Sequence, residues 1–180
     1  CLGDFQEVEG IHQRGDWDLS RHSEFSGQKL DYFDQKSDKR FTPHIMETSV
    51  GLNRLVLVVL DNAYTIEDLG EGKTRTVLKI LPKLAPIKVA VFPLQKDEKL
   101  QELAKNIYHD LKKLYVTEFD DSGNIGKMYR RQDEIGTPYC VTVDYQSLDD
   151  DMVTLRDRDT MQQERVKVSE LFNTLKQKYD

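Results

Sequence analysis

The protein has 180 residues, of which 38% are hydrophobic and 32% are charged, so it can bury a core and is not a wholly disordered chain. Its net charge of −6 lacks the basic excess that usually marks a nucleic-acid-binding protein, so any polyanion must meet local basic groups. No apolar run approaches the length of a membrane span, which excludes an integral membrane protein of the helical type.

Cysteine is rare, and its two positions, Cys1 and Cys140, belong to no CxxC or Cys/His cluster. This usage disfavours a disulfide framework and a structural zinc site, and it favours a reducing compartment, for which the cytoplasm is the default.

The first half of the chain alternates short strand-like pieces with polar loops, up to a seam with two prolines at residues 81–88. Imperfect alternation predicts a strand over Asp4–Ile11, and two apolar runs around the polar turn "DQKSDKR" predict a hairpin over residues 27–47. The apolar run at residues 52–64 has the length of a helix and follows a glycine, so we expect a buried helix there.

The second half has a cleaner pattern of elements. Strands are expected at residues 87–94, 116–121, 139–145, 151–160 and 164–168. Helices are expected at residues 100–114, 124–137 and 169–179, the last with Ser169 as its N-cap. Strands alternating with helices and then following one another predict an α/β layered domain whose mixed sheet is flanked by helices.

Possible chemistry is concentrated in "ETSVGLNR", at residues 47–54. If a strand ends there and a helix begins near Leu52, Gly51 lies at the turn, where a ligand can approach the backbone. Free N–H groups of the helix N-terminus and the Arg54 guanidinium would then suit a phosphate, while Glu47 could hold an ammonium group or a metal. The alternative is a Glu47–Arg54 ion pair that closes a buried turn, and the spacing alone favours it, because structural pairs outnumber sites.

Three other groups of residues could also carry chemistry. Glu7 and Glu9 share one face of the expected first strand and could act together on a cation. His12 and His22 lack a companion at ligand spacing and read as surface histidines. In "RDRDT", a self-neutralising exposed strand and an RNA contact are about equally good interpretations.

Taken together, "EVEGIHQRGDWDL", "PHIMETSVGLNR", "LAPIKVAVFPL", "DDSGNIGKMYRRQDEIGTPYCVTVDY" and "VTLRDRDTMQQERV" resemble the C-terminal part of a dimeric-type glycyl-tRNA synthetase, in the family's order. Residues 1–81 resemble the end of a class II catalytic domain built on an antiparallel sheet, and residues 82–180 resemble the α/β anticodon-binding domain. "ETSVGLNR" is similar to class II motif 3, except that Thr48 stands where proline is common.

The resemblance also implies roles for individual residues. Arg54 and Glu47 would be the catalytic pair, with Arg54 on the ATP phosphates and Glu47 near the ammonium of glycine. The implied glycine-binding residues are Glu47, Thr48, Ser49, Val50 and Gly51. The implied ATP-binding residues are Glu7, Val8, Gly51, Leu52, Asn53 and Arg54, and Glu7 is a candidate ligand for Mg²⁺.

The implied partners are tRNA(Gly), glycine, ATP and, in the full-length family enzyme, a second copy in a homodimer. Charge alone marks a candidate set for tRNA, namely Lys127, Arg130, Arg131, Arg156 and Arg158. The chain starts at Cys1 and lacks counterparts of motifs 1 and 2, so we expect these 180 residues alone to be inactive and without the dimer interface.

Two other interpretations compete with a ligase. A non-catalytic synthetase-like protein, such as a DNA polymerase accessory subunit, need not keep the amino-acid pocket, whereas Glu47, Ser49 and Arg54 are all present here. A free-standing RNA-binding module would leave the first 80 residues without a purpose.

Overall fold

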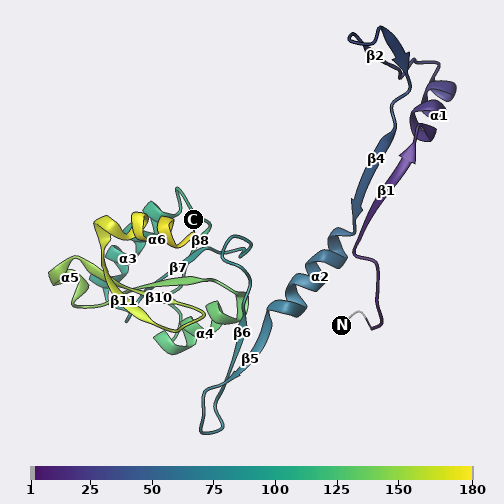
Figure 1. Cartoon of the computed structure of the whole chain (residues 1–180). Helices are drawn as coiled ribbons and strands as arrows, with labels where there is room; N and C mark the ends of the chain where they lie inside the picture. The colour runs from purple at the N-terminus through teal and green to yellow at the C-terminus, as the bar shows by residue number, and fades with distance from the viewer. Residues whose placement is uncertain (1–2, 180) are drawn as a thin grey trace. The chain divides into compact units, whose positions relative to one another are not determined.

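The computed structural model describes residues 3–179, which divide into two compact units, Cys1–Val58 and Val59–Asp180 (Figure 1). The division falls inside one helix, α2 (Leu52–Ala63), which begins in the first unit and ends in the second. The expected seam at residues 81–88 therefore lies within the second unit, and the boundary by packing comes earlier than the prolines suggested.

The first unit is built on a two-stranded antiparallel ladder of β1 (Glu9–Gly15) and β4 (Ile45–Val50). Between them the chain forms helix α1 (Trp17–Ser26) and a small hairpin, β2 (Tyr32–Asp34) with β3 (Lys39–Phe41). The expected hairpin thus forms, while the expected first strand begins later than predicted, at Glu9 instead of Asp4.

The first unit has almost no core, because among residues 3–58 only Gly10 is buried. Helix α2 illustrates this most clearly, since its helical character was predicted correctly but its burial was not. Leu52 is 70% exposed, and Leu55, Val56, Leu57 and Leu60 are all exposed as well. Periodicity reports which residues could pack, but it does not report whether another element is there to cover them.

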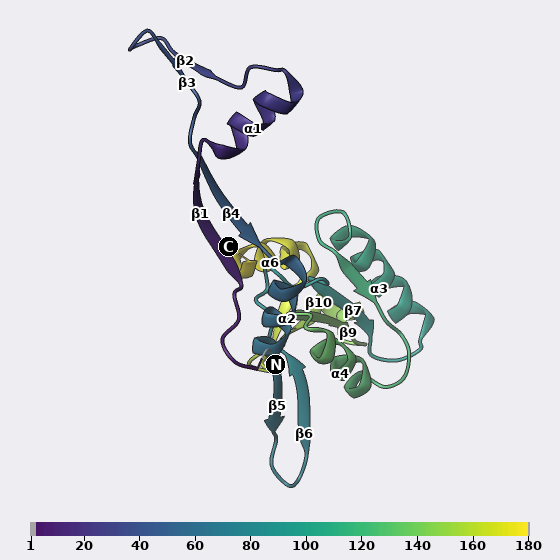
Figure 2. The same cartoon turned by 90° about the vertical axis from the view of Figure 1, so that its right-hand side faces the viewer.

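The second unit opens with a hairpin, β5 (Tyr64–Asp68) and β6 (Thr74–Leu78), whose strands run side by side in Figure 2. The chain then continues through an alternation of strands and helices. These elements are β7 (Val89–Pro93), α3 (Glu98–Leu111), β8 (Thr117–Phe119), α4 (Ile125–Ile135), β9 (Tyr139–Val143), α5 (Ser147–Asp150), β10 (Met152–Asp157), β11 (Gln163–Lys167), the 3-10 turn η1 (Val168–Glu170) and α6 (Leu171–Tyr179).

The sheet of the second unit is mixed, as the sequence predicted. Its order is β11-β10-β9-β7-β8, with β8 and β9 parallel to β7 and with β9, β10 and β11 antiparallel in succession. The three-residue strand β8 forms one edge, and β11, which exposes Gln163 and Glu164, forms the other.

Alternate residues of the central strand β7 face opposite layers, as the twofold period of a strand requires. Val89 and Val91 pack in a cluster with residues of α3 and α6, such as Leu100 and Leu175. Phe92, on the other face, packs against Met128 of α4. Helices therefore cover both faces of the sheet, which is the layered arrangement expected of an α/β domain.

Helix ends in this unit follow the capping residues that the sequence supplies. The Asp97 carboxylate accepts from the N–H groups of Lys99 and Leu100 at the start of α3, and the Asn124 side chain accepts from Lys127 N–H at the start of α4. Ser169 is not the N-cap that was predicted, because it lies within the 3-10 turn that precedes α6.

None of the helices within residues 3–179 has the length and apolar character that crossing a lipid bilayer requires.

Candidate functional site

A polar turn joins β4 to α2 in the first unit, and it carries the residues singled out from the sequence. Leu55 N–H donates to the Gly51 carbonyl, and this bond is the first turn of the helix. The N–H groups of Leu52 and Asn53 therefore have no partner inside the helix, and they are the donors that a phosphate or another anion would meet.

An open cavity of about 780 Å³ lies beside this turn. Its lining combines the start of α2 with the segment that leads into β1. The residues that line it are Glu7, Val8, Ser49, Val50, Gly51, Leu52, Asn53, Arg54 and Leu57. The six residues expected for ATP thus share one cavity, although Glu7 and Arg54 are far apart in the sequence.

The alternative ion pair between Glu47 and Arg54 does not form in this structure. A terminal nitrogen of Arg54 donates instead to the main-chain carbonyl of Glu7, which ties the start of α2 to the segment before β1. Glu47 lies 3.3 Å from Arg14, whose guanidinium also holds the Asp18 carboxylate through two hydrogen bonds of 2.6 and 2.7 Å. Each of the two expected catalytic groups therefore has its own partner.

The five residues expected for glycine do not all face the same way. Because side chains alternate along a strand, Glu47 and Ser49 lie on one face of β4, while Thr48 and Val50 lie on the other. Ser49, Val50 and Gly51 line the cavity described above, but Glu47 and Thr48 are not part of that lining.

A metal ion in this unit would find no ready-made cluster of ligands among the described residues. Among residues 3–179 there is no group of three or more His, Cys, Asp or Glu side chains arranged to hold a metal ion. Glu7 alone brings a carboxylate to the cavity lining. Magnesium is commonly held by one or two carboxylates together with substrate phosphates, so Glu7 is compatible with that role.

The five cations expected at a tRNA surface fall into two groups in the second unit. Lys127 and Arg130 are exposed on α4, and Arg131, which is half-buried, donates to Asp120 through Nε at 2.9 Å. Burial opposes ionisation of Asp120, but hydrogen bonds from Ser122 and the Arg131 charge outweigh it and hold the pKa of that carboxyl below its usual range.

Arg156 and Arg158 do not belong to an exposed strand, so that part of the sequence prediction is wrong. Arg156 is 5% exposed and Arg158 is 2% exposed. Arg158 donates to the Gly136 carbonyl at 2.7 Å and to the Asp159 carboxylate at 2.9 and 2.8 Å. With their donors committed inside the protein, neither guanidinium is placed to reach a phosphate.

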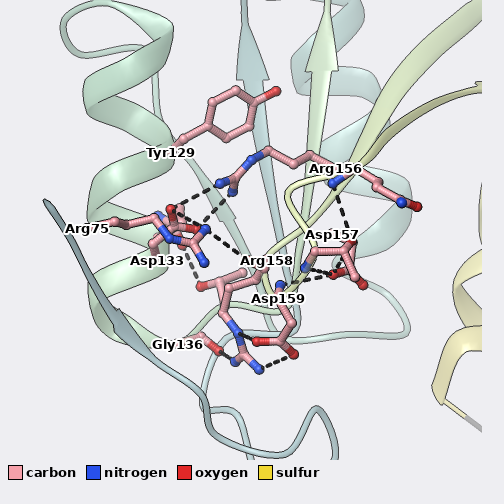
Figure 3. A network of polar contacts seen from close by, with 12 residues as sticks. Arg75, Tyr129, Asp133, Gly136, Arg156, Asp157, Arg158 and Asp159 are labelled. Carbon is pink, nitrogen blue, oxygen red and sulfur yellow. Dashed lines mark hydrogen bonds and ion pairs between the residues drawn. The ribbon is translucent and has the colours of Figure 1, made fainter. Parts of the chain in front are cut away.

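Both arginines take part in a buried network of charged side chains (Figure 3). Arg156 donates twice to Asp133, at 2.8 and 3.1 Å, and its guanidinium lies 4.6 Å from the centre of the Tyr129 ring. Arg75, from strand β6, reaches the same carboxylate at 3.3 Å. Two buried cations thus share one buried anion, and two carboxylates at the rim of the network add further negative charge, Glu67 beside Arg75 and Asp159 beside Arg158.

Sequence reasoning missed Arg75 and Asp133, although a signal was present for the first. Arg75 shares its face of β6 with Val77, which is fully buried. A charged residue in register with a core residue of a strand indicates a buried ion pair, but the pattern does not name the partner.

The chain is similar to known proteins over nearly its whole length. Residues 88–178 match the family described as "Anticodon binding domain". The chain is 52% identical over 174 residues to a glycine–tRNA ligase of Borrelia garinii subsp. bavariensis, covering 96% of this chain and 39% of that protein. It is 50% identical over 167 residues to a glycine–tRNA ligase of Clostridium beijerinckii, covering 93% of this chain and 36% of that protein.

Among solved structures, the fold is similar to that in a crystal structure of the RNA binding domain of threonyl-tRNA synthetase from Cryptosporidium parvum Iowa II. The TM-score is 0.68 at 21% identity, covering 96% of this chain and 39% of that one. The chain spans about two fifths of the length of the curated relatives it matches.

Proposed function

The chain belongs to the family of anticodon-binding domains, and we propose that it serves a glycine–tRNA ligase as part of a longer polypeptide. In this proposal the second unit binds the anticodon region of tRNA(Gly). The first unit supplies part of the site where glycine is activated with ATP. The parent enzyme then transfers the glycyl group to the 3′ end of the tRNA.

The cavity at the start of α2 is the observation that carries the ATP half of the proposal. One lining brings together free helix N–H groups, the Arg54 guanidinium and the Glu7 segment. Helix N-termini and arginine forks are two of the commonest ways in which proteins hold phosphates. A triphosphate would replace the Glu7 carbonyl as the acceptor for Arg54, since a charged acceptor makes the stronger hydrogen bond.

The glycine half of the proposal depends on Glu47 and Ser49, which share a face of β4. Glycine is a zwitterion without a side chain, so selectivity must come from charge and from lack of space. The Glu47 carboxylate would attract the ammonium group, and Arg14, itself held by Asp18, would keep that carboxylate in position.

Activation is a displacement at phosphorus. A carboxylate oxygen of glycine attacks the α-phosphate of ATP, the bond to the β-phosphate oxygen breaks, and pyrophosphate leaves. A hydroxyl of the terminal tRNA ribose then attacks the glycyl carbonyl, loses its proton, and displaces AMP. Arg54 and the helix N–H groups would stabilise negative charge on the phosphates, and no covalent enzyme intermediate is needed. Mg²⁺, when bound with the phosphates, would neutralise part of their charge, and Glu7 is the carboxylate of this chain that would face it.

Binding of tRNA by an acidic protein must use local cations. Lys127, Arg130 and Arg131 lie along α4, and we propose that this helix meets the phosphate backbone. Contacts of this kind release counterions, so binding should weaken steeply as salt is raised.

Assembly and location are inferred from the resemblance to glycyl-tRNA synthetases. We infer that the parent protein works as a homodimer in the cytoplasm. A polymerase accessory subunit is not favoured, since the similar proteins of about 50% identity carry the ligase name.

The proposal is tested with the full-length parent protein, which should charge tRNA(Gly) with radioactive glycine and carry out glycine-dependent ATP–pyrophosphate exchange. Charging with glycine must exceed charging with alanine and serine. Tight tRNA binding without any glycine-dependent exchange would contradict it and would favour a non-catalytic relative.

A further inference from the structure

The β5–β6 hairpin continues directly from α2, so its position is tied to the end of that helix. Helix α2 ends at Ala63, and β5 begins at Tyr64. Lys79, the residue after β6, donates its N–H to the Ala63 carbonyl at 2.7 Å. Whatever fixes the hairpin in the second unit therefore also fixes the last turn of α2.

Arg75 connects this hairpin to the rest of the second unit. Its side chain is 4% exposed, and its Nε donates to Glu67 of the neighbouring strand at 2.8 Å. One terminal nitrogen reaches across to Asp133 at 3.3 Å and to the Arg158 carbonyl at 2.9 Å. The hairpin is thus attached both to α4 and to the segment that follows β10.

Asp133 is the point at which these attachments meet. It lies on α4, one turn beyond Arg130, and its carboxylate is bonded by Arg75 from the hairpin and by Arg156 from the sheet (Figure 3). A buried carboxylate shared by two guanidinium groups is strongly held, because removal of either partner leaves charge without compensation in a medium of low dielectric constant. The network therefore joins three elements at one carboxylate.

We propose that Arg75 and Asp133 are positioning residues for the transfer of glycine to tRNA. Their ion pair locks the hairpin, and with it the end of α2, to the helix that presents Lys127 and Arg130. This proposal rests on the proposed function. Neither residue needs to touch glycine, ATP or tRNA, since each acts by holding another element in place.

The test uses the full-length protein and separates the two half-reactions. Arg75→Gln and Asp133→Asn should raise the KM for tRNA(Gly) in aminoacylation by about tenfold or more, while glycine-dependent ATP–pyrophosphate exchange stays within about twofold. Because the two residues act through one contact, the double variant should be little worse than the worse single variant.

Asp150→Asn is the matched control. It removes a carboxylate that holds Arg165 through bonds of 2.9 and 3.0 Å in the same unit, away from the hairpin. It should leave the KM for tRNA unchanged. Thermal melting of each variant, followed by circular dichroism, confirms that the assay temperature lies below the transition.

Several results would overturn the proposal. One is a normal KM for tRNA in folded Arg75→Gln, even where Asp133→Asn is impaired, because the effect of Asp133 would then not depend on the hairpin. Another is an equal loss in both half-reactions. If Arg75→Gln does not fold, Arg75→Lys decides, because it keeps the cation but loses the fork, and a wild-type KM there would also contradict the proposal. Absence of charging by the unaltered protein would instead contradict the proposed function.

Discussion

The main-chain carbonyl oxygen of Leu78 lies 2.8 Å from the point where a β-carbon on Gly136 would stand. Gly136 ends α4 with a φ of 85°, and Leu78 is the last residue of β6. A side chain at position 136 would therefore meet both a left-handed backbone and a rigid neighbour. This contact is a second point, beside the Arg75–Asp133 ion pair, at which the hairpin packs against the end of α4.

Gly136→Ala should lower the free energy of unfolding by about 2–4 kcal/mol, since about 1 kcal/mol of backbone strain is joined by a displacement of β6. Chemical denaturation followed by circular dichroism measures the loss. Gly123→Ala is the matched control, because Gly123 has a similar φ of 92° but its β-carbon would meet only Lys127 side-chain atoms, 3.7 Å away or more. Equal losses for the two variants would show that the Leu78 contact is unimportant.

Arg156→Ala should destabilise the second unit by about 3–5 kcal/mol, because Asp133 would lose a buried, doubly bonded partner. The melting temperature of the protein gives the readout. Arg165→Ala removes a guanidinium that is about one quarter exposed and pairs with Asp144 and Asp150, so its cost should be about 1–2 kcal/mol, as expected of an ion pair nearer the solvent. A cost below that of Arg165→Ala would mean that the buried network contributes little.

Lowering the pH should weaken the ion pairs of Glu67 with Lys79 and Arg75, which help to stabilise the hairpin. Hydrogen bonding to Lys79, and to a smaller extent the Arg75 contact, hold the pKa of Glu67 below its ordinary value of 4.5. Stability from this group is therefore fully present above that value and is lost as the pH falls below it. Glu67→Gln should flatten the decline in stability below about pH 4.5. A steeper decline in the variant would contradict the assignment.

Cys140 should be unreactive in the folded protein. It is 1% exposed on β9, and burial raises the pKa of its thiol far above the ordinary range, so almost no thiolate forms at neutral pH. Alkylation with iodoacetamide, located by peptide mass spectrometry, should find Cys140 unmodified until denaturant is added. Rapid native modification would mean that β9 opens readily.

Arg54→Ala should reduce glycine-dependent ATP–pyrophosphate exchange by the full-length protein about 100-fold or more, since a guanidinium on the phosphates is expected to contribute about 3 kcal/mol or more to the transition state. Arg54→Lys should recover only part of the loss, because lysine lacks the planar fork. Arg21→Ala, which alters an arginine of α1 paired with Glu24, is the control. Full exchange activity in Arg54→Ala would remove Arg54 from the ATP site.

The layered second unit was predictable from sequence because its elements are locally consistent. Apolar residues of α3 recur at three- and four-residue steps, and Leu100, Ala104, Ile107 and Leu111 are indeed its buried residues. The strand predicted from Tyr139 is also confirmed, although it is buried on both faces and ends at Val143. Such patterns depend on near neighbours alone.

The errors concern partners that lie far away in the sequence. No residue close to Arg156 in the sequence indicates that Asp133 is its partner. Arg75 is 58 positions away from the carboxylate that it contacts. Alternation places Arg156 on one side of β10, but only the fold decides that α4 and the hairpin cover that side. The same limit applies to α2, whose leucines were expected to be buried and are exposed here.

The sheet of the second unit ends on both sides in strands that offer little to a neighbouring molecule. Strand β8 is only three residues long, and β11 begins with Gln163, Glu164 and Arg165. Open strand edges are templates for intermolecular pairing, and shortness and charge are the features that suppress it. Strand-to-strand pairing between copies through the edges of this sheet should therefore be suppressed.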